Sequence, residues 1–130
     1  MFEEFNKVDK PELLNPLVLA YIGDAVYEVY IRVHITKLGF AKTNALHKEA
    51  TTYVSARAQA NILTKIEANL SEEELNIVRR GRNAHSHTIP KNATIADYKK
   101  ATAFEALIGY LFLSKRNERL EEIISIAINI

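Results

Sequence analysis

The apolar positions of this chain concentrate in two long stretches. The first runs from about residue 16 to 36 and the second from about residue 94 to 114. Both are apolar on nearly every helical face, and helices of that kind normally lie in the interior of a domain. An acidic residue stands among the apolar positions of each stretch, Asp24 in the first and Glu105 in the second. The pattern therefore predicts two central helices that each bury a carboxylate.

The first of these helices has clear start and end signals. Asn15 is a favourable N-cap, and Pro16 suits the first helical position. Gly39 is typical of the residue that follows a helix end. At about 1.5 Å per residue such a helix is about 30 Å long, which is enough to cross a small domain. Thr94 is expected to open the second helix.

Shorter helices are expected between the two central ones. In residues 42–69, the apolar positions recur at the spacing of one or two amphipathic helices, namely Leu46, Ala50, Tyr53, Val54, Ala58 and Ile62. Ser71 and Glu74 have the spacing of a capping box, which predicts a further short helix to about Arg80.

The remaining segments complete an all-helical picture. Residues 81–93 are rich in Asn, His, Thr and Pro and are expected to form a loop. A last helix is expected from about residue 118 to 130, and a short apolar element at Leu13 and Leu14. No segment alternates apolar and polar residues as a strand does. The prediction is a single all-α domain of 130 residues with five to seven helices.

Composition excludes several classes of protein. Apolar residues make up 48% of the chain, as in a globular domain rather than a disordered one. The absence of cysteine excludes disulfides and thiolate metal sites. The first residues lack the pattern of a signal peptide, and charged residues interrupt every long apolar stretch, so no membrane span is expected. A soluble cytoplasmic protein is the expectation.

The charge of the chain is nearly balanced overall but uneven locally. The formal net charge is +1, whereas residues 79–100 contain six basic residues and one acidic residue. A local excess of this kind suits contact with a polyanion such as a nucleic acid. The alternative is a solvated loop with scattered basic residues.

The two isolated carboxylates are the strongest candidates for chemistry. A buried ionised carboxylate needs a partner, and neither Asp24 nor Glu105 has a basic residue one turn away in its own helix. A Mg²⁺ ion held by one or two carboxylates and a phosphate would fit that need. Gly23 and Gly109 would let the two helices approach closely. The alternative is a distant lysine or arginine for each acid.

The other polar residues give weaker signals. Glu28 could share the metal, but Arg32 follows at i+4, which favours an ion pair. The histidines do not have the spacing of a zinc site. The acidic run at residues 72–74 is better explained by helix capping than by the metal helices of an all-α nucleotide pyrophosphatase.

Two segments match a known family. The sequence Ile22-Gly-Asp-Ala-Val26 resembles the signature helix of the ribonuclease III family, and Phe104-Glu-Ala-Leu-Ile-Gly109 resembles its later metal-binding helix. Residues 79–83 and 90–92 are similar to the Mini-ribonuclease III branch, which has a catalytic domain and no double-stranded-RNA-binding domain. The resemblance covers about residues 12–115.

This resemblance implies a homodimeric, Mg²⁺-dependent endonuclease for double-stranded RNA, with Asp24 and Glu105 as catalytic metal ligands. In the Mini branch the implied substrate is the terminal stem of the 23S ribosomal RNA precursor. The implied helper is a ribosomal protein or the pre-ribosomal particle. Residues expected to contact RNA are Arg79, Arg80, Arg82, Asn83, His85 and Lys91.

The chain also departs from the full family pattern. Leu17 and Ala20 stand where two signature glutamates are expected, and Thr102 stands where an acid precedes the late glutamate. Water, Thr102 or Glu28 could complete the metal shell. The departures leave open a non-catalytic RNA-binding or ribosome-associated module of the same fold, which would bind duplex RNA without cutting it.

A dimer interface is expected to use apolar helix surface that one small domain does not hide. The candidates are Tyr27, Tyr30 and the isoleucine-rich C-terminal helix.

Overall fold

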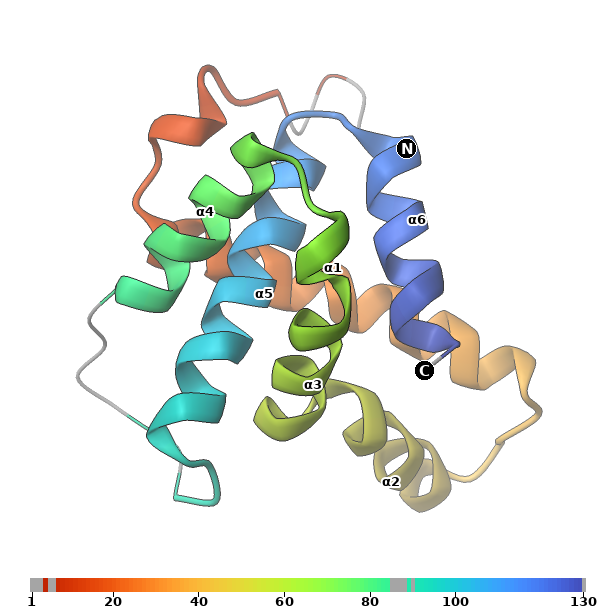
Figure 1. The fold of residues 1–130 in the computed structure, drawn as a ribbon. Helices are drawn as coiled ribbons and strands as arrows, with labels where there is room; N and C mark the ends of the chain where they lie inside the picture. The colour runs from red at the N-terminus through yellow and green to blue at the C-terminus, as the bar shows by residue number, and fades with distance from the viewer. Residues whose placement is uncertain (1–3, 5–6, 85–88, 90, 130) are drawn as a thin grey trace.

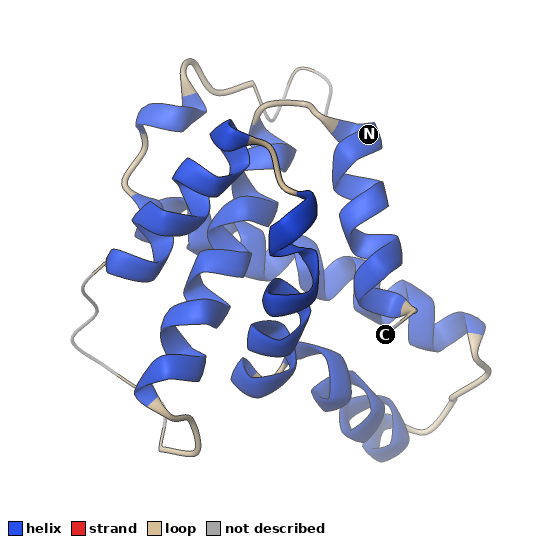
Figure 2. Ribbon diagram, in the orientation of Figure 1, coloured by secondary structure: helices blue, strands red, loops and turns tan. Residues whose placement is uncertain are grey.

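A computed structural model describes residues 4, 7–84, 89 and 91–129 of the chain. These residues form helices and loops and contain no strand (Figure 2). The α-helices are α1 (Pro16–Lys37), α2 (Thr43–Val54), α3 (Ala56–Ile66), α4 (Glu72–Asn83), α5 (Ile95–Leu113) and α6 (Asn117–Ile128). Short 3₁₀ turns, η1 (Pro11–Leu13) and η2 (Glu67–Asn69), precede α1 and α4. The prediction of an all-α fold with five to seven helices is confirmed.

Helix α5 lies at the centre of the bundle (Figure 1). Helices α1, α3, α4 and α6 all pack against it, and most of its length is buried. Helix α2 lies at the edge, where it contacts α1 and α3 and contains no fully buried residue. The second apolar stretch is therefore the central helix that its pattern predicts.

The predicted helix starts are confirmed by cap geometry. The Asn15 side chain accepts a hydrogen bond from the Leu17 amide at 2.8 Å. Ser71 and Glu74 form both bonds of the capping box, and the Thr94 hydroxyl accepts from the Asp97 amide. These local signals act within a few residues, which explains why the sequence alone predicts them well.

Two expectations are wrong, one about the burial of α1 and one about the end of α4. Helix α1 is not buried on all sides, because it lies at the surface of the bundle and leaves Val18, Tyr21, Val29 and Val33 exposed. Helix α4 continues to Asn83 instead of ending near Arg80. Its glycine, Gly81, packs so close to α5 that a side chain there would lie 2.8 Å from the Ala103 Cα. The glycine thus serves helix packing rather than helix termination.

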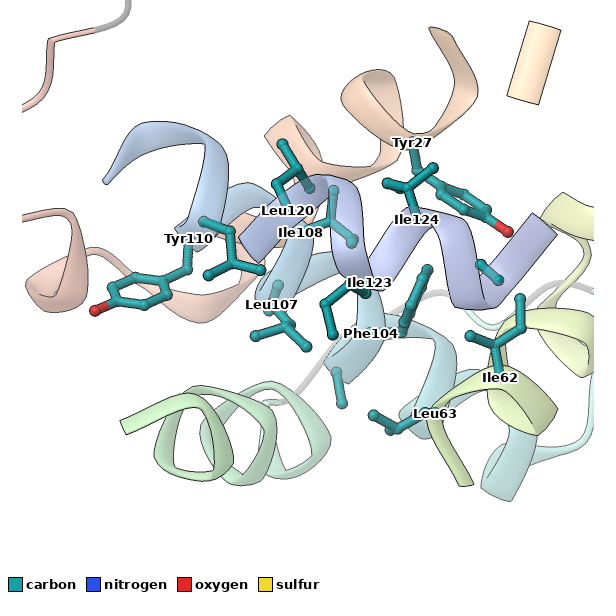
Figure 3. Packing of buried hydrophobic residues seen from close by; sticks show 14 of the residues in the cluster. Tyr27, Ile62, Leu63, Phe104, Leu107, Ile108, Tyr110, Leu120, Ile123 and Ile124 are labelled. Atoms are coloured by element: carbon teal, nitrogen blue, oxygen red, sulfur yellow. The ribbon is translucent and has the colours of Figure 1, made fainter. Parts of the chain in front are cut away.

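The core contains buried residues of α1, α3, α4, α5 and α6. Figure 3 shows part of this cluster. Tyr27 of α1 meets the Phe104 ring edge-on at a centroid distance of 5.1 Å. Leu120, Ile123 and Ile124 of α6 are buried in the same cluster.

This packing corrects part of the expected dimer surface. Tyr27 is fully buried within its own chain, and Ile123 and Ile124 of α6 are buried in the core. Among the described candidates, Ile126 is exposed, and Tyr30 and Ile128 are partly buried.

Among the described residues, no helix has the length and apolar character needed to cross a bilayer.

Candidate active site

The two glycines beside the carboxylates lie where α1 crosses α5. A methyl group at Gly23 would lie 1.7 Å from the Glu105 carbonyl oxygen, and one at Gly109 would lie 1.9 Å from the Leu19 carbonyl oxygen. Real side chains never approach backbone so closely, so both positions need glycine. The close crossing brings Asp24 and Glu105 together from helices that are about 80 residues apart in the chain. The prediction that Gly23 and Gly109 allow a close approach is confirmed.

Glu105 is the recessed member of the pair. Burial, the negative charge of Asp24 and a hydrogen bond shared with the Asp24 carboxyl raise the pKa of Glu105 from 4.5 to about 8. No lysine or arginine forms an ion pair with either carboxylate in the described part of the chain. Two acids held together in this way repel each other, and a cation between them would relieve both the repulsion and the desolvation.

The Asp24 side chain is more exposed to solvent than the sequence predicts. Its side chain is exposed, because the face of α1 that carries it is turned to solvent. The expectation of two equally buried acids is therefore wrong for Asp24. One turn further along, Glu28 pairs with Arg32 at 3.5 Å, so the expected ion pair is confirmed.

A third side chain, Gln59 of α3, reaches Glu105. Its Nε2 donates to Glu105 Oε2 at 3.4 Å and to the Val54 carbonyl at 3.0 Å. Gln59 is only 2% exposed. The sequence analysis did not predict a role for Gln59. The pattern could have indicated one, because this polar residue shares the apolar face of α3 with Ile62, Leu63 and Ile66.

The donor set fits an oxygen-preferring divalent ion with few protein ligands. Within the described residues, no cluster of three or more His, Asp or Glu side chains could hold a metal. Asp24 and Glu105 would therefore be the protein ligands of such an ion, and a pair of carboxylates would suit Mg²⁺ with water and phosphate as its other ligands. The Thr102 hydroxyl lies one turn from Glu105, is buried and donates to the Tyr98 carbonyl. His34 lies against Tyr53, and no group of three or more metal-ligating side chains in the described part of the chain includes it.

The six residues expected to bind RNA lie in different settings. Arg79 of α4, Asn83 at its end and Lys91 in the following loop are exposed. Arg80 is engaged with backbone, since its guanidinium donates to the carbonyls of Glu12 and Leu14. Arg82 is partly buried, and His85 lies outside the described residues.

Arg82 borders a basic cavity on the side of the bundle where α3, η2, α4 and α5 meet. The cavity has a volume of about 370 Å³ and is lined by Glu67, Arg82, Ala96, Lys99 and Lys100. Arg82 pairs with Glu67 at 2.5 Å, and Lys100 donates to the Thr64 hydroxyl at 3.0 Å. Three cations against one acid leave this surface positive.

Comparisons with known proteins point to one family. Residues 17–116 match the model of the ribonuclease III domain. A Mini-ribonuclease 3 of Brevibacillus brevis is 58% identical over 88% of this chain and 85% of its own length. A Mini-ribonuclease 3 of Clostridium tetani is 50% identical over 98% of this chain and 85% of its own length.

A solved structure shows the same fold. The crystal structure of a protein from Fusobacterium nucleatum superposes with a TM-score of 0.83 at 37% identity, covering 90% of this chain and 93% of that protein. The matched region includes both acid-bearing helices and the crossing between them. Sequence motif, helical architecture and overall similarity agree, and the chain belongs to the ribonuclease III family, in its Mini-ribonuclease 3 branch.

Proposed function

We propose that Asp24 and Glu105 hold a Mg²⁺ ion with which this endoribonuclease hydrolyses double-stranded RNA. The observation that carries the proposal is the recessed Glu105 carboxyl beside Asp24, with no basic side chain paired to either in the described residues. A pair of oxygen donors without a protein cation suits Mg²⁺. Membership in a ribonuclease family supports RNA as the substrate.

The two carboxylates have different tasks because their surroundings differ. Mg²⁺, when bound, supplies a deprotonated water and neutralises charge on the phosphate. Glu105 holds its ligand position from within the packed bundle. Asp24, which is exposed, faces the RNA and orients the attacking water. The water oxygen loses a proton and bonds to phosphorus, and the bond to the 3′ oxygen breaks. The 3′ oxygen takes up a proton from solvent, which leaves a 5′-phosphate and a 3′-hydroxyl.

The duplex is held through its backbone by the basic surface at the end of α4. Arg79, Asn83 and Lys91 are exposed there, and His85 follows in the same segment. Arg82, Lys99 and Lys100 add positive charge at the neighbouring cavity. Phosphate contacts supply most of the affinity for an RNA helix, and an A-form duplex is recognised largely by its shape.

Membership in the Mini branch supports a proposal for the natural substrate and the location. We propose the terminal stem of the 23S ribosomal RNA precursor as the substrate and the cytoplasm as the location. A ribosomal protein or the pre-ribosomal particle is the proposed helper in presenting that stem.

The active form is a homodimer joined through α1. Val18, Tyr21, Val29 and Val33 form an exposed apolar stripe along this helix, with exposed fractions of 46%, 79%, 59% and 50%. Leu13 of η1, which precedes α1 in the chain, is also exposed, at 72%. An apolar face of this length is unusual on a monomer, and a two-fold axis would let the same face of a second copy cover it.

Cleavage of a labelled RNA duplex tests the proposal. The native protein should cut the duplex with Mg²⁺ and stop when EDTA is added. Asp24→Asn and Glu105→Gln should each abolish detectable cleavage while remaining folded. Glu28→Gln is the matched control, since Glu28 lies one turn from Asp24 and pairs with Arg32. This control should cut at nearly the native rate.

The possible results separate the candidate functions. Duplex binding without cutting by the native protein, even on a 23S precursor stem, would favour a non-catalytic RNA-binding module. Cutting that survives both substitutions would place the active site elsewhere.

A further inference from the structure

The amide of Gln59 has only one suitable orientation. Its two N–H groups lie at one end of the amide, where the Val54 carbonyl is 3.0 Å away and Glu105 Oε2 is 3.4 Å away. Both partners are oxygens that accept hydrogen bonds. The reverse orientation would set the amide oxygen against them. The side chain is therefore a donor to Glu105, fixed by a second bond to backbone.

The surroundings of Gln59 favour an apolar residue. It is 2% exposed, and its neighbours on the same face of α3 are Ile62, Leu63 and Ile66. Its Oε1 is buried and has no hydrogen-bond partner among the described residues. A buried amide with an unpaired acceptor costs stability relative to an apolar side chain of the same shape. Packing alone therefore does not explain a glutamine at this position.

The backbone that anchors Gln59 is itself held in place. The Val54 carbonyl is the last of α2, and the preceding carbonyl, that of Tyr53, accepts a hydrogen bond from the Tyr27 hydroxyl at 3.1 Å. Tyr27, which lies on α1, is fully buried in the core of the bundle. Side chains from α1 and α3 thus fix the end of α2, and Gln59 extends from this fixed point to Glu105.

We infer that Gln59 is a positioning residue that holds the Glu105 carboxylate where it can bind the metal. The inference rests on the proposed role of Glu105 as a Mg²⁺ ligand. Side chains that orient a metal ligand typically change metal affinity or activity about 10- to 100-fold when they are removed. Gln59 reaches Glu105 without contacting RNA or solvent, so its effect should appear in metal binding itself.

Metal binding to the whole protein without RNA tests this inference. Gln59→Met keeps the length of the side chain and removes both N–H groups, and Gln59→Leu serves as a second variant that suits the apolar face. Mn²⁺ is the probe, with affinity measured by electron paramagnetic resonance and by calorimetry. Both variants should bind Mn²⁺ about 10- to 100-fold more weakly than the native protein.

A matched control separates positioning from stability. Ile62→Val removes a methyl group from the same buried face of α3 and leaves Glu105 untouched. This variant should lower the melting temperature while Mn²⁺ affinity stays native. In cleavage assays, the Gln59 variants should need more Mg²⁺ for half-maximal rate and should recover most of the native rate at saturating Mg²⁺.

Native Mn²⁺ affinity in a folded Gln59→Met or Gln59→Leu protein would overturn the inference and leave the proposed function intact. Equal Mn²⁺ binding by the native protein and by Glu105→Gln would instead overturn the proposed function and the inference together.

Discussion

Gly23 of α1 and Gly109 of α5 face each other across the helix crossing. A methyl group on Gly23 would lie 2.8 Å from the Gly109 nitrogen, and one on Gly109 would lie 3.0 Å from the Gly23 nitrogen. This contact sets how closely the backbones of α1 and α5 approach each other. Asp24 follows the first glycine, and Glu105 lies one helical turn before the second. The close backbone approach therefore assembles the two carboxylates.

Substitution at this crossing should disrupt the fold. Gly23→Ala would force the helices apart, because its Cβ would lie 1.7 Å from backbone that cannot move alone. Overpacking of this kind costs about 1–3 kcal/mol or more, and the shift would also separate Asp24 from Glu105. Chemical denaturation measures the loss of stability.

Gly39→Ala is the control for this substitution. Gly39 has a φ of 93° and open space around it, so the substitution should cost about 1 kcal/mol of local backbone strain. Equal stability of the two variants would contradict the packing argument.

The raised pKa of Glu105 predicts a pH-dependent stability of the metal-free protein. Burial and Asp24 raise this pKa from 4.5 to about 8 in the folded state. Between these values the folded protein keeps a proton that the unfolded chain has lost, so its stability falls as the pH rises. The unfolding constant should rise by up to about tenfold per pH unit from this group.

Urea denaturation between pH 5 and about pH 8, in EDTA, measures this slope. Glu105→Gln should remove the contribution of Glu105 to the pH dependence of stability. This variant should be more stable than the native protein at the upper end of the pH range. Glu72→Gln, at the exposed start of α4, should keep the native slope. Parallel curves for native protein and Glu105→Gln would show that Glu105 does not titrate in this window.

Two neighbouring arginines should behave differently when replaced. Arg80→Ala removes hydrogen bonds of 2.6 and 2.7 Å to the carbonyls of Glu12 and Leu14, so it should destabilise the protein by about 1–3 kcal/mol. Arg79→Ala removes an exposed cation and should leave stability within about 0.5 kcal/mol. Arg79→Ala should instead weaken duplex binding and reduce the salt slope by about 1.

Thermal unfolding and salt-dependent duplex binding, both measured in an Asp24→Asn background to prevent cutting, compare these variants. Weakened RNA binding by Arg80→Ala at native stability would assign Arg80 to the RNA surface instead.

The proposed dimer should depend on the apolar stripe of α1. Val29 is 59% exposed at the middle of this stripe. Val29→Asp would place a charge in the interface and should shift the protein from dimer to monomer at micromolar concentration. Sedimentation velocity measures this shift. Ile95→Asp is the matched control, because Ile95 is equally exposed, at 60%, but lies at the start of α5. A native protein that sediments as a monomer would contradict the dimer.

Local signals in the sequence were sufficient for the helices and for the two catalytic candidates. The caps at Asn15, Ser71 and Thr94 act within three or four residues, so their geometry follows from the sequence next to them. Asp24 and Glu105 stand out because a carboxylate in an apolar helix requires an explanation of its own.

Tertiary packing decided what no local pattern encodes. Whether Gly81 ends α4 or packs it against α5, and whether Tyr27 faces a partner or the core, depends on which helices meet. The same is true of Gln59, whose role exists only because α3 lies beside Glu105. The helices and the two acids were predictable without the structure, since they are set by neighbouring residues. Only the folded bundle decided which acid is recessed, because burial depends on contacts between residues that are far apart in the chain.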